Sequence, residues 1–199
     1  MSKLKNIHFD FYKIEDIKYS KYLYKDCTAK KKEFIQDKSK NNAIDIKNIA
    51  YVSLYYNQNP LIYITTPVMV CLFGMKNQLM SLQFTNLKTD SIMKSFFKFI
   101  ENIEINNMIN LGITDDDSDK YVSQIRYDKE KKYEPNLSVK VPFTKNCYDA
   151  DIFSDEYDTC NMHNINNFTK MKCDIYIDKI WYFNEQFICK WKVKNIYLV

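Results

Sequence analysis

The C-terminal part of the chain has the most regular alternation of apolar and polar positions. Every second residue from Met171 to Ile177 is apolar, Asn184-Glu185 is a turn-forming pair, and a second alternating run begins at Phe187. Successive side chains of a strand point to opposite faces, so the second run separates an apolar face from a basic face. The apolar face carries Phe187, Cys189, Trp191 and Val193, and the other face carries Lys190, Lys192 and Lys194. The pattern predicts a hairpin with a row of lysines along one side.

Strand patterns also occur in the middle of the chain. Residues 49–56 and 61–73 are rich in β-branched and aromatic side chains, and the Asn-Gln-Asn-Pro sequence between them has turn chemistry. This order predicts a hairpin. Residues 78–85 alternate between apolar and mixed positions, which indicates a strand with one buried face.

One stretch has helical rather than strand periodicity. Apolar residues recur at spacings of three and four after Asp90, a residue type that is favoured at helix N-caps. These apolar residues are Ile92, Phe96, Phe99, Ile100 and Ile103. Further short strands are expected at 121–127, 137–143 and 148–153, and a long polar loop is expected at 154–167.

Many short strands with one inserted helix predict a mainly β fold. The expected architecture is an OB-like Greek-key barrel. Residues 1–48 are rich in lysine and have only short apolar patches, so they are expected to form a peripheral or partly ordered segment. Residues 49–199 are expected to form the barrel domain.

Composition favours a folded intracellular protein. Hydrophobic residues make up 46% and charged residues 27% of the 199 residues, as in ordinary globular domains. The net charge of +4 is mildly basic and compatible with a polyanionic partner. The six cysteines form no Cys-x-x-Cys pair and are expected to be reduced, as in the cytoplasm or nucleus. No apolar run reaches the roughly 20 residues of a membrane span, so no membrane partner is expected.

Residues that carry catalysis are scarce. Phosphate-binding loops rely on several glycines, and the chain has only Gly74 and Gly112. Neither His8 nor His163 stands at a spacing from a Cys, Ser or carboxylate that is diagnostic of a catalytic motif. We expect no enzymatic activity and no cofactor.

Metal binding has weak support in the sequence. Cys160-x-x-His163 has ligand spacing, but no second pair completes the four ligands of a structural zinc site. The acidic run at 115–119 lacks the turn glycine and the terminal glutamate of a calcium loop, so it is interpreted as a solvated loop. No metal site is expected, and a metal-dependent nuclease that uses these aspartates is kept as an alternative.

Basic and aromatic side chains are interleaved in the final hairpin and just before the strand at 137–143. Lysines can follow a phosphate backbone while aromatic rings stack on bases, which together bind single strands with little sequence preference. The plainer interpretation is a solvated lysine face and a solvated loop. The candidate nucleic-acid-binding residues are Arg126, Tyr127, Lys131, Lys132, Tyr133, Lys140, Trp181, Tyr182, Lys190, Lys192 and Lys194.

The order of several short segments resembles that of a known family. The segments are 61–67, 72–74, 80–84, 96–103, 133–142, 180–182, 187 and 191–193, and they span residues 49–198. In this order they resemble the single-stranded DNA-binding proteins of large nucleocytoplasmic DNA viruses, which are similar to phage replication-type OB-fold proteins. The resemblance implies an OB-fold that coats single strands during viral replication or recombination, with Lys140, Trp181 and Lys192 on or near the binding barrel.

The expected function is therefore binding of single-stranded DNA without strong sequence preference, through lysine–phosphate contacts and aromatic stacking. RNA is an alternative ligand, and a homo-oligomer and replication proteins are further expected partners at a cytoplasmic or nuclear site of viral replication. The alternative function is a non-enzymatic structural or protein-interaction module of a viral replication or virion complex. Lysines scattered over the surface would favour that alternative, and lysines gathered along a groove would favour binding of single strands.

Overall fold

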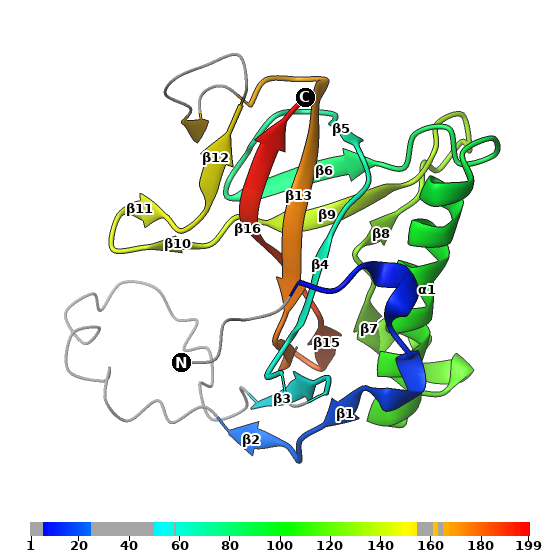
Figure 1. Ribbon diagram of the computed structural model, residues 1–199. Helices are drawn as coiled ribbons and strands as arrows, with labels where there is room; N and C mark the ends of the chain where they lie inside the picture. Colours follow the sequence, from blue (N-terminus) through cyan, green and yellow to red (C-terminus); the bar gives the residue numbers. More distant parts are fainter. Residues whose placement is uncertain (1–5, 25–49, 58, 155–160, 163–164) are drawn as a thin grey trace, which may run out of the picture.

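The computed structural model describes residues 6–24, 50–57, 59–154, 161–162 and 165–199 (Figure 1). Its centre is a ring of five strands. In chain order they are β5 (Met69–Cys71), β6 (Leu79–Gln83), β9 (Asn136–Lys140), β13 (Thr169–Ile177) and β16 (Trp191–Leu198). Another strand, β4 (Ile62–Thr65), pairs with β13 beside β5.

The strand pairings close this ring into a barrel. β13 pairs with β5, β5 with β6, β6 with β9, and β13 with β16, all antiparallel. A parallel pairing of β9 with β16 completes the circle. Around the ring the strands follow the order first, second, third, fifth, fourth, which is the Greek-key order of an OB-like barrel. The predicted fold class is confirmed.

Alternation of side chains explains why these segments form a barrel. On β6 and β9, every second side chain points inward and is buried, and the side chains between them are partly exposed or exposed. Leu82, Leu137 and Val139 are fully buried, as are Trp191 and Val193 at the start of β16 to within 1%. Burial of these apolar side chains is the main stabilising contribution, at about 25 cal/mol for each Å² removed from water.

The helix predicted after Asp90 is confirmed. α1 spans Ser91–Leu111, and the Asp90 carboxylate accepts hydrogen bonds from the backbone N–H groups of Ile92 and Met93. Gly112 ends the helix with a φ of 70°, a conformation that a residue with a Cβ rarely adopts. Phe96, Phe99, Ile100 and Ile103 are buried in the core as the stripe predicted, whereas Ile92 is exposed. The ring of Phe96 lies 5.9 Å from that of Phe84, the residue after β6. Figure 1 shows α1 along one side of the barrel.

A second sheet lies below the barrel in Figure 1. Its strands are β1 (Lys18–Tyr19), β2 (Leu23–Tyr24), β3 (Ala50–Tyr55), β7 (Tyr121–Val122), β14 (Lys179–Phe183) and β15 (Gln186–Ile188). β3 pairs with β1, β2 and β14, whereas β4 pairs with β13 in the barrel. The predicted hairpin of 49–56 with 61–73 is therefore wrong. Within the described residues no strand pairing joins the two segments, and an isolated bridge from Tyr56 to Asn59 closes the turn between them. Composition indicated strands correctly but did not indicate their distant partners.

The predicted C-terminal hairpin lies in the connection between the barrel strands β13 and β16. β14 pairs with β15 across Asn184-Glu185, as predicted for the turn, while β13 pairs with β16 on either side of this inner hairpin. Asn184 and Glu185 have φ values of 49° and 60°, the backbone of a type I′ turn. Cys189 is buried with Trp191 and Val193, as the alternation predicted, and Phe187 packs partly buried against the core.

The N-terminal segment contributes to the core. Residues 6–24 include the short 3-10 helices η1 (Phe9–Phe11) and η2 (Ile14–Asp16), and Phe9, Tyr12 and Ile17 are buried. The ring of Phe9 lies 5.2 Å from that of Phe96 on α1. This part of the segment expected to be peripheral is thus integrated into the fold, and residues 25–48 lie outside the description.

The remaining elements are short. They are η5 (Asp115–Lys120), β8 (Ile125–Arg126), β10 (Phe143–Thr144), β11 (Cys147–Tyr148) and β12 (Asp151–Phe153). The acidic run forms η5 and is not a loop without structure, and the predicted loop at 154–167 is only partly described. No helix within the described residues is both long and apolar enough to cross a membrane.

Candidate nucleic-acid interface

A basic groove lies where the connection between β13 and β16 folds against the end of β9. Its volume is about 180 Å³, and it is lined by Lys140, Lys179, Trp181, Ile188, Lys190 and Lys192. We call this feature the lysine groove. It combines lysine ammonium groups with one aromatic and one aliphatic side chain.

Strand register brings the lysines together. Lys140 is the last residue of β9, and its Cα partner on the parallel strand β16 is Lys192. Residues paired in this way lie side by side, about 4.8 Å apart across the sheet. Lys190 immediately precedes β16, so the alternation places it on the same side as Lys192.

The inner hairpin supplies the opposite wall. Lys179 and Trp181 are two residues apart on β14, so their side chains point to the same face. Ile188 on β15 is the Cα partner of Trp181, which places it beside the indole. The hairpin thus sets an apolar surface against the lysines from β9 and β16.

Like charges are concentrated in the groove. Burial lowers the pKa of Lys190, and the positive charge of Lys140 lowers it further. Lys192 is paired with Asp178, with 2.7 Å between Nζ and Oδ1, and both side chains are about one-quarter exposed. The groove therefore has four lysines and a carboxylate paired with one of them, and this excess of positive charge attracts anions.

Aromatic rings hold Lys179 in place. The ring of Tyr51 on β3 lies 5.3 Å from that of Trp181, with the planes inclined by 50°. The Nζ of Lys179 lies 4.5 Å from the centre of the Tyr51 ring and 5.7 Å from that of Trp181. This cation–π geometry positions the ammonium group at the groove.

Four of the predicted residues line the groove: Lys140, Trp181, Lys190 and Lys192. Tyr182 follows Trp181 on β14 and points to the other face, where its ring lies 4.8 Å from that of Phe187. Lys194 continues the lysine row on β16, but it is exposed, lies outside the groove and has its Nζ 3.6 Å from a carboxylate oxygen of Asp149.

The other predicted residues gather on the turn that joins β8 to β9, at the far end of β9 from Lys140. We call residues 126–133 the basic turn, and its predicted members are Arg126, Tyr127, Lys131, Lys132 and Tyr133, all exposed. The backbone N–H of Lys132 donates to the Asp128 carboxylate at 2.8 Å, and the ammonium group of Lys132 is paired with Glu130. The Tyr127 hydroxyl donates to Glu101 of α1 at 3.2 Å.

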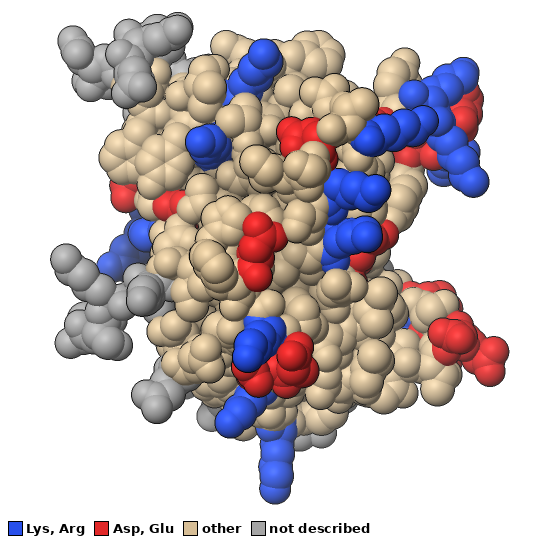
Figure 2. Space-filling view, turned by 45° about the vertical axis from the view of Figure 1, so that its right-hand side comes forward, with Lys and Arg blue, Asp and Glu red and all other residues tan. Residues whose placement is uncertain are grey.

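Charges of both signs share this side of the molecule. Figure 2 turns the α1 side forward and shows lysines and arginines interspersed with acidic residues and separated by neutral surface. The basic turn is itself a mixed-charge region, because Asp128 and Glu130 contact Lys132 within it. The lysine groove has a stronger excess of positive charge.

A neutral polar surface connects the two features. The outward side chains of β6 and β9 are paired in register, Ser81 with Ser138 and Gln83 with Asn136. The Ser81 hydroxyl donates to the Asn136 side-chain oxygen at 2.6 Å. Between the basic turn and the lysine groove, the outward face of β9 and its neighbour β6 therefore carries uncharged hydrogen-bonding side chains.

Lys179, Ile188 and Tyr51 were missed as site residues. Alternation from Trp181 could have identified Lys179, since residues two apart on a strand share a face. Tyr51 could not have been found in this way, because its contact with Trp181 depends on the pairing of β3 with β14.

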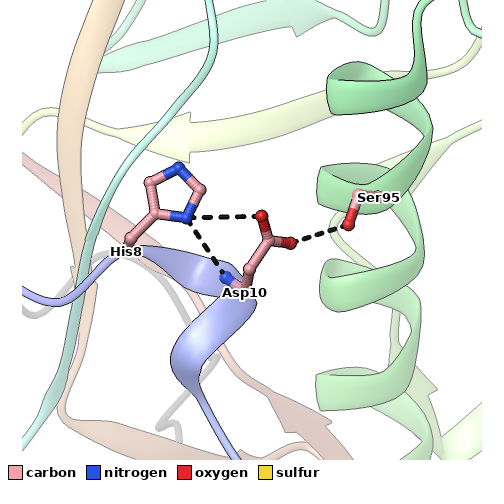
Figure 3. A network of polar contacts seen from close by, with 3 residues as sticks. All are labelled: His8, Asp10 and Ser95. Carbon is pink, nitrogen blue, oxygen red and sulfur yellow. Dashed lines mark hydrogen bonds and ion pairs between the residues drawn. The ribbon is translucent and has the colours of Figure 1, made fainter.

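A serine, a histidine and an aspartate meet near the N-terminus, but not in the order that nucleophilic catalysis needs. The Ser95 hydroxyl donates to Asp10 at 2.7 Å, and the Asp10 carboxylate lies 3.5 Å from Nδ1 of His8 (Figure 3). In a catalytic triad the imidazole stands between the hydroxyl and the carboxylate. Here the carboxylate lies between the other two groups, and the imidazole of His8 does not contact the serine hydroxyl.

The acidic run is exposed on η5, where Asp117 is paired with Lys120 at 2.6 Å. Within the described part of the chain, no group of three or more His, Cys, Asp or Glu side chains is placed to hold a metal ion. Cys160 and His163 lie outside the described residues.

Comparison with known proteins gives distant structural likeness only. No family model matches the chain, and no curated protein matches its sequence. It is similar to the structure titled single-stranded DNA-binding protein from bacteriophage Enc34 in complex with ssDNA, at 10% identity over 74% of this chain and 89% of that chain, with a TM-score of 0.44. The C-terminally truncated form of the phage protein has 10% identity over 73% and 88% of the two chains, with a TM-score of 0.45.

Proposed function

We propose that this protein binds single-stranded nucleic acid, DNA foremost, with the lysine groove as the centre of its interface. The observation that carries the proposal is the convergence of Lys140, Lys190 and Lys192 with Lys179 and Trp181 in one groove. Lysines far apart in the sequence are gathered here, which favours an anionic ligand over a structural module with a scattered basic surface.

The position of the groove in the barrel supports this proposal. OB-fold proteins bind oligonucleotides on the face of the second and third strands and on the loops that join the first to the second and the fourth to the fifth. Here the third strand is β9, which ends at Lys140, and the connection between the fourth and fifth strands carries β14 and β15.

Each wall of the groove has a role in binding. The ammonium groups contact phosphates, and these contacts release counterions from the nucleic acid. The side chains of Trp181 and Ile188 offer apolar surface to an unstacked base, whereas a duplex keeps its bases stacked and paired. Neither contact reads a base edge, so we propose coating without strong sequence preference during viral DNA replication or recombination, without turnover or a cofactor.

The test is a titration of the purified protein with a labelled poly-pyrimidine oligonucleotide and with the matching duplex at several salt concentrations. The single strand should bind more tightly. The logarithm of affinity should fall with the logarithm of salt at a slope of about −0.7 for each lysine–phosphate contact. Lys140→Ala should weaken binding and reduce this slope, and Lys194→Ala is the matched control outside the groove. Tighter binding of the duplex, or a flat salt dependence, would contradict the proposal.

A further inference from the structure

Asp178 forms an ion pair with Lys192, one of the lysines that line the lysine groove. Its Oδ1 lies 2.7 Å from Nζ of Lys192, and the two side chains are 26% and 24% exposed. Within the described residues, Lys192 is the only lysine of the groove that forms an ion pair.

The backbone fixes the position of this carboxylate. Asp178 joins β13 to β14, where the chain passes from the barrel into the second sheet. Its carbonyl oxygen accepts a hydrogen bond of 3.0 Å from the backbone N–H of Leu54 on β3. Lys192 also has a cation–π contact, since its Nζ lies 5.6 Å from the centre of the Tyr176 ring.

The groove needs a counter-charge when no ligand is present. Lys140 and Lys192 are Cα partners, and Lys190 already has a lowered pKa because of burial and the charge of Lys140. A cluster of like charges in a partly buried groove destabilises the folded state unless an anion is nearby. Asp178 provides one negative charge at the place where a ligand phosphate would provide another.

The pair of Lys194 with Asp149 on the same strand is different. Its charged atoms are 3.6 Å apart, and the two side chains are 46% and 57% exposed. Exposed pairs of this kind contribute little to stability because water and salt screen them. It is therefore the natural control.

We propose that Asp178 is a built-in counter-ion of the lysine groove, which a phosphate of the bound strand replaces at Lys192. This proposal deepens the proposed function and rests on it for the identity of the ligand. In the free protein Asp178 stabilises the lysine cluster. In the complex the same carboxylate competes with phosphate, so it limits affinity and eases release.

Asp178→Asn tests this competition, because the amide keeps the size of the side chain and removes its charge. The variant should bind the poly-pyrimidine oligonucleotide about fivefold more tightly than the wild type. Its salt slope should be steeper by about 0.7, since Lys192 becomes free to contact one more phosphate. Asp149→Asn should change neither quantity, and the gain from Asp178→Asn should disappear in a Lys192→Ala background. Weaker or unchanged binding by Asp178→Asn would overturn the proposal, because the carboxylate would then position Lys192 or have no role.

A second measurement separates this proposal from the proposed function. Thermal unfolding is followed with inorganic pyrophosphate and with sodium chloride at equal ionic strength. Asp178→Asn should unfold at a lower temperature than the wild type, and pyrophosphate should restore more stability to it than to the wild type or Asp149→Asn. If pyrophosphate restores the stability of Asp178→Asn but the protein binds no oligonucleotide, the proposed function is refuted and the counter-ion role of Asp178 is supported. Equal responses to pyrophosphate in all variants would refute the counter-ion.

Discussion

Lys190 carries a charge that the fold accommodates at the expense of stability. The residue is partly buried beside Lys140, and both effects lower its pKa from the usual value for lysine. A lysine whose pKa is lowered in the folded state destabilises that state fully below the folded pKa. The effect shrinks as the pH rises above the folded pKa and is gone above the unfolded pKa. Such a charge is expected where a ligand supplies the missing anion.

Replacing Lys190 with methionine should therefore separate stability from binding. The apolar side chain keeps the length and removes the charge, so the unfolding free energy near pH 7 should rise by about 0.5 kcal/mol or less, as expected for a screened charge. The gain should shrink at alkaline pH, where the wild-type lysine is deprotonated. Affinity for single strands should fall at the same time. Denaturant titrations at two pH values, with Lys194→Met as control, measure both effects, and a variant that is less stable than the wild type would contradict this account.

Trp181 lines the groove and also packs on Tyr51, so its loss should affect both binding and stability. Its ring packs on Tyr51 and lies beneath Lys179, yet it is only partly buried, unlike Trp191 in the core. Trp181→Ala should lower affinity for single strands by about 1–3 kcal/mol, through loss of stacking and of the support for Lys179. The loss of stability should be below the roughly 3–5 kcal/mol of a buried aromatic residue.

Trp181→Phe distinguishes stacking from structural support, because it keeps an aromatic ring on Tyr51. It should recover the stability of the wild type and most of the affinity. Melting and binding are measured on the same samples. An alanine variant that loses stability but binds like the wild type when folded would remove Trp181 from the interface.

At the scale of elements, the inner hairpin of β14 and β15 forms a wall of the groove, and its turn is under local strain. Asn184 and Glu185 both have positive φ values, at 49° and 60°. Asparagine tolerates this region, whereas glutamate has a Cβ that clashes with the backbone there. Glycine at the second position gives the Asn-Gly pair that type I′ turns favour.

Glu185→Gly should therefore stabilise the protein by about 1 kcal/mol. The turn lies away from the lysines of the groove, so affinity and salt slope should stay unchanged. Thermal unfolding tests the gain, and Glu185→Ala is the control because alanine keeps the unfavourable Cβ. Equal stability of the two variants would mean that the backbone at Glu185 is unstrained.

The sequence predicted individual elements better than their partners. Alternation identified β6, β13 and the lysine row of β16, and capping identified the start of α1, because these signals depend on neighbouring residues. The pairing of β3 with β14 joins residues more than a hundred positions apart, and no local pattern encodes it. That pairing is also what carries Tyr51 to Trp181. Four of the six side chains that line the groove were thus among the predicted residues, whereas Tyr51, which packs on Trp181, was not.

At the scale of the whole molecule, the lysine groove and the basic turn lie at opposite ends of β9. The strand spans Asn136–Lys140, so about 13 Å of backbone separates the two ends at about 3.3 Å for each residue. The neutral face of β6 and β9 lies between them, with Ser81, Ser138 and Asn136 available for hydrogen bonds. A single strand long enough to cover this face would meet both basic features.

The basic turn should therefore matter only for long ligands. Binding sites on OB-folds cover about 4–16 nucleotides. Lys131→Ala combined with Lys132→Ala should leave the affinity for an oligonucleotide of about 4 nucleotides unchanged, because the groove alone accommodates it. For about 16 nucleotides the same variant should lose affinity, and its salt slope should be smaller by up to about 1.4, which is two contacts at about 0.7 each.

Lys140→Ala should weaken binding of both oligonucleotides and serves as the contrasting variant. Since Lys132 is paired with Glu130 in the free protein, the loss of slope should fall nearer to one contact than to two. Equal losses for short and long oligonucleotides would place the basic turn within the central site, and no loss at either length would confine the strand to the groove.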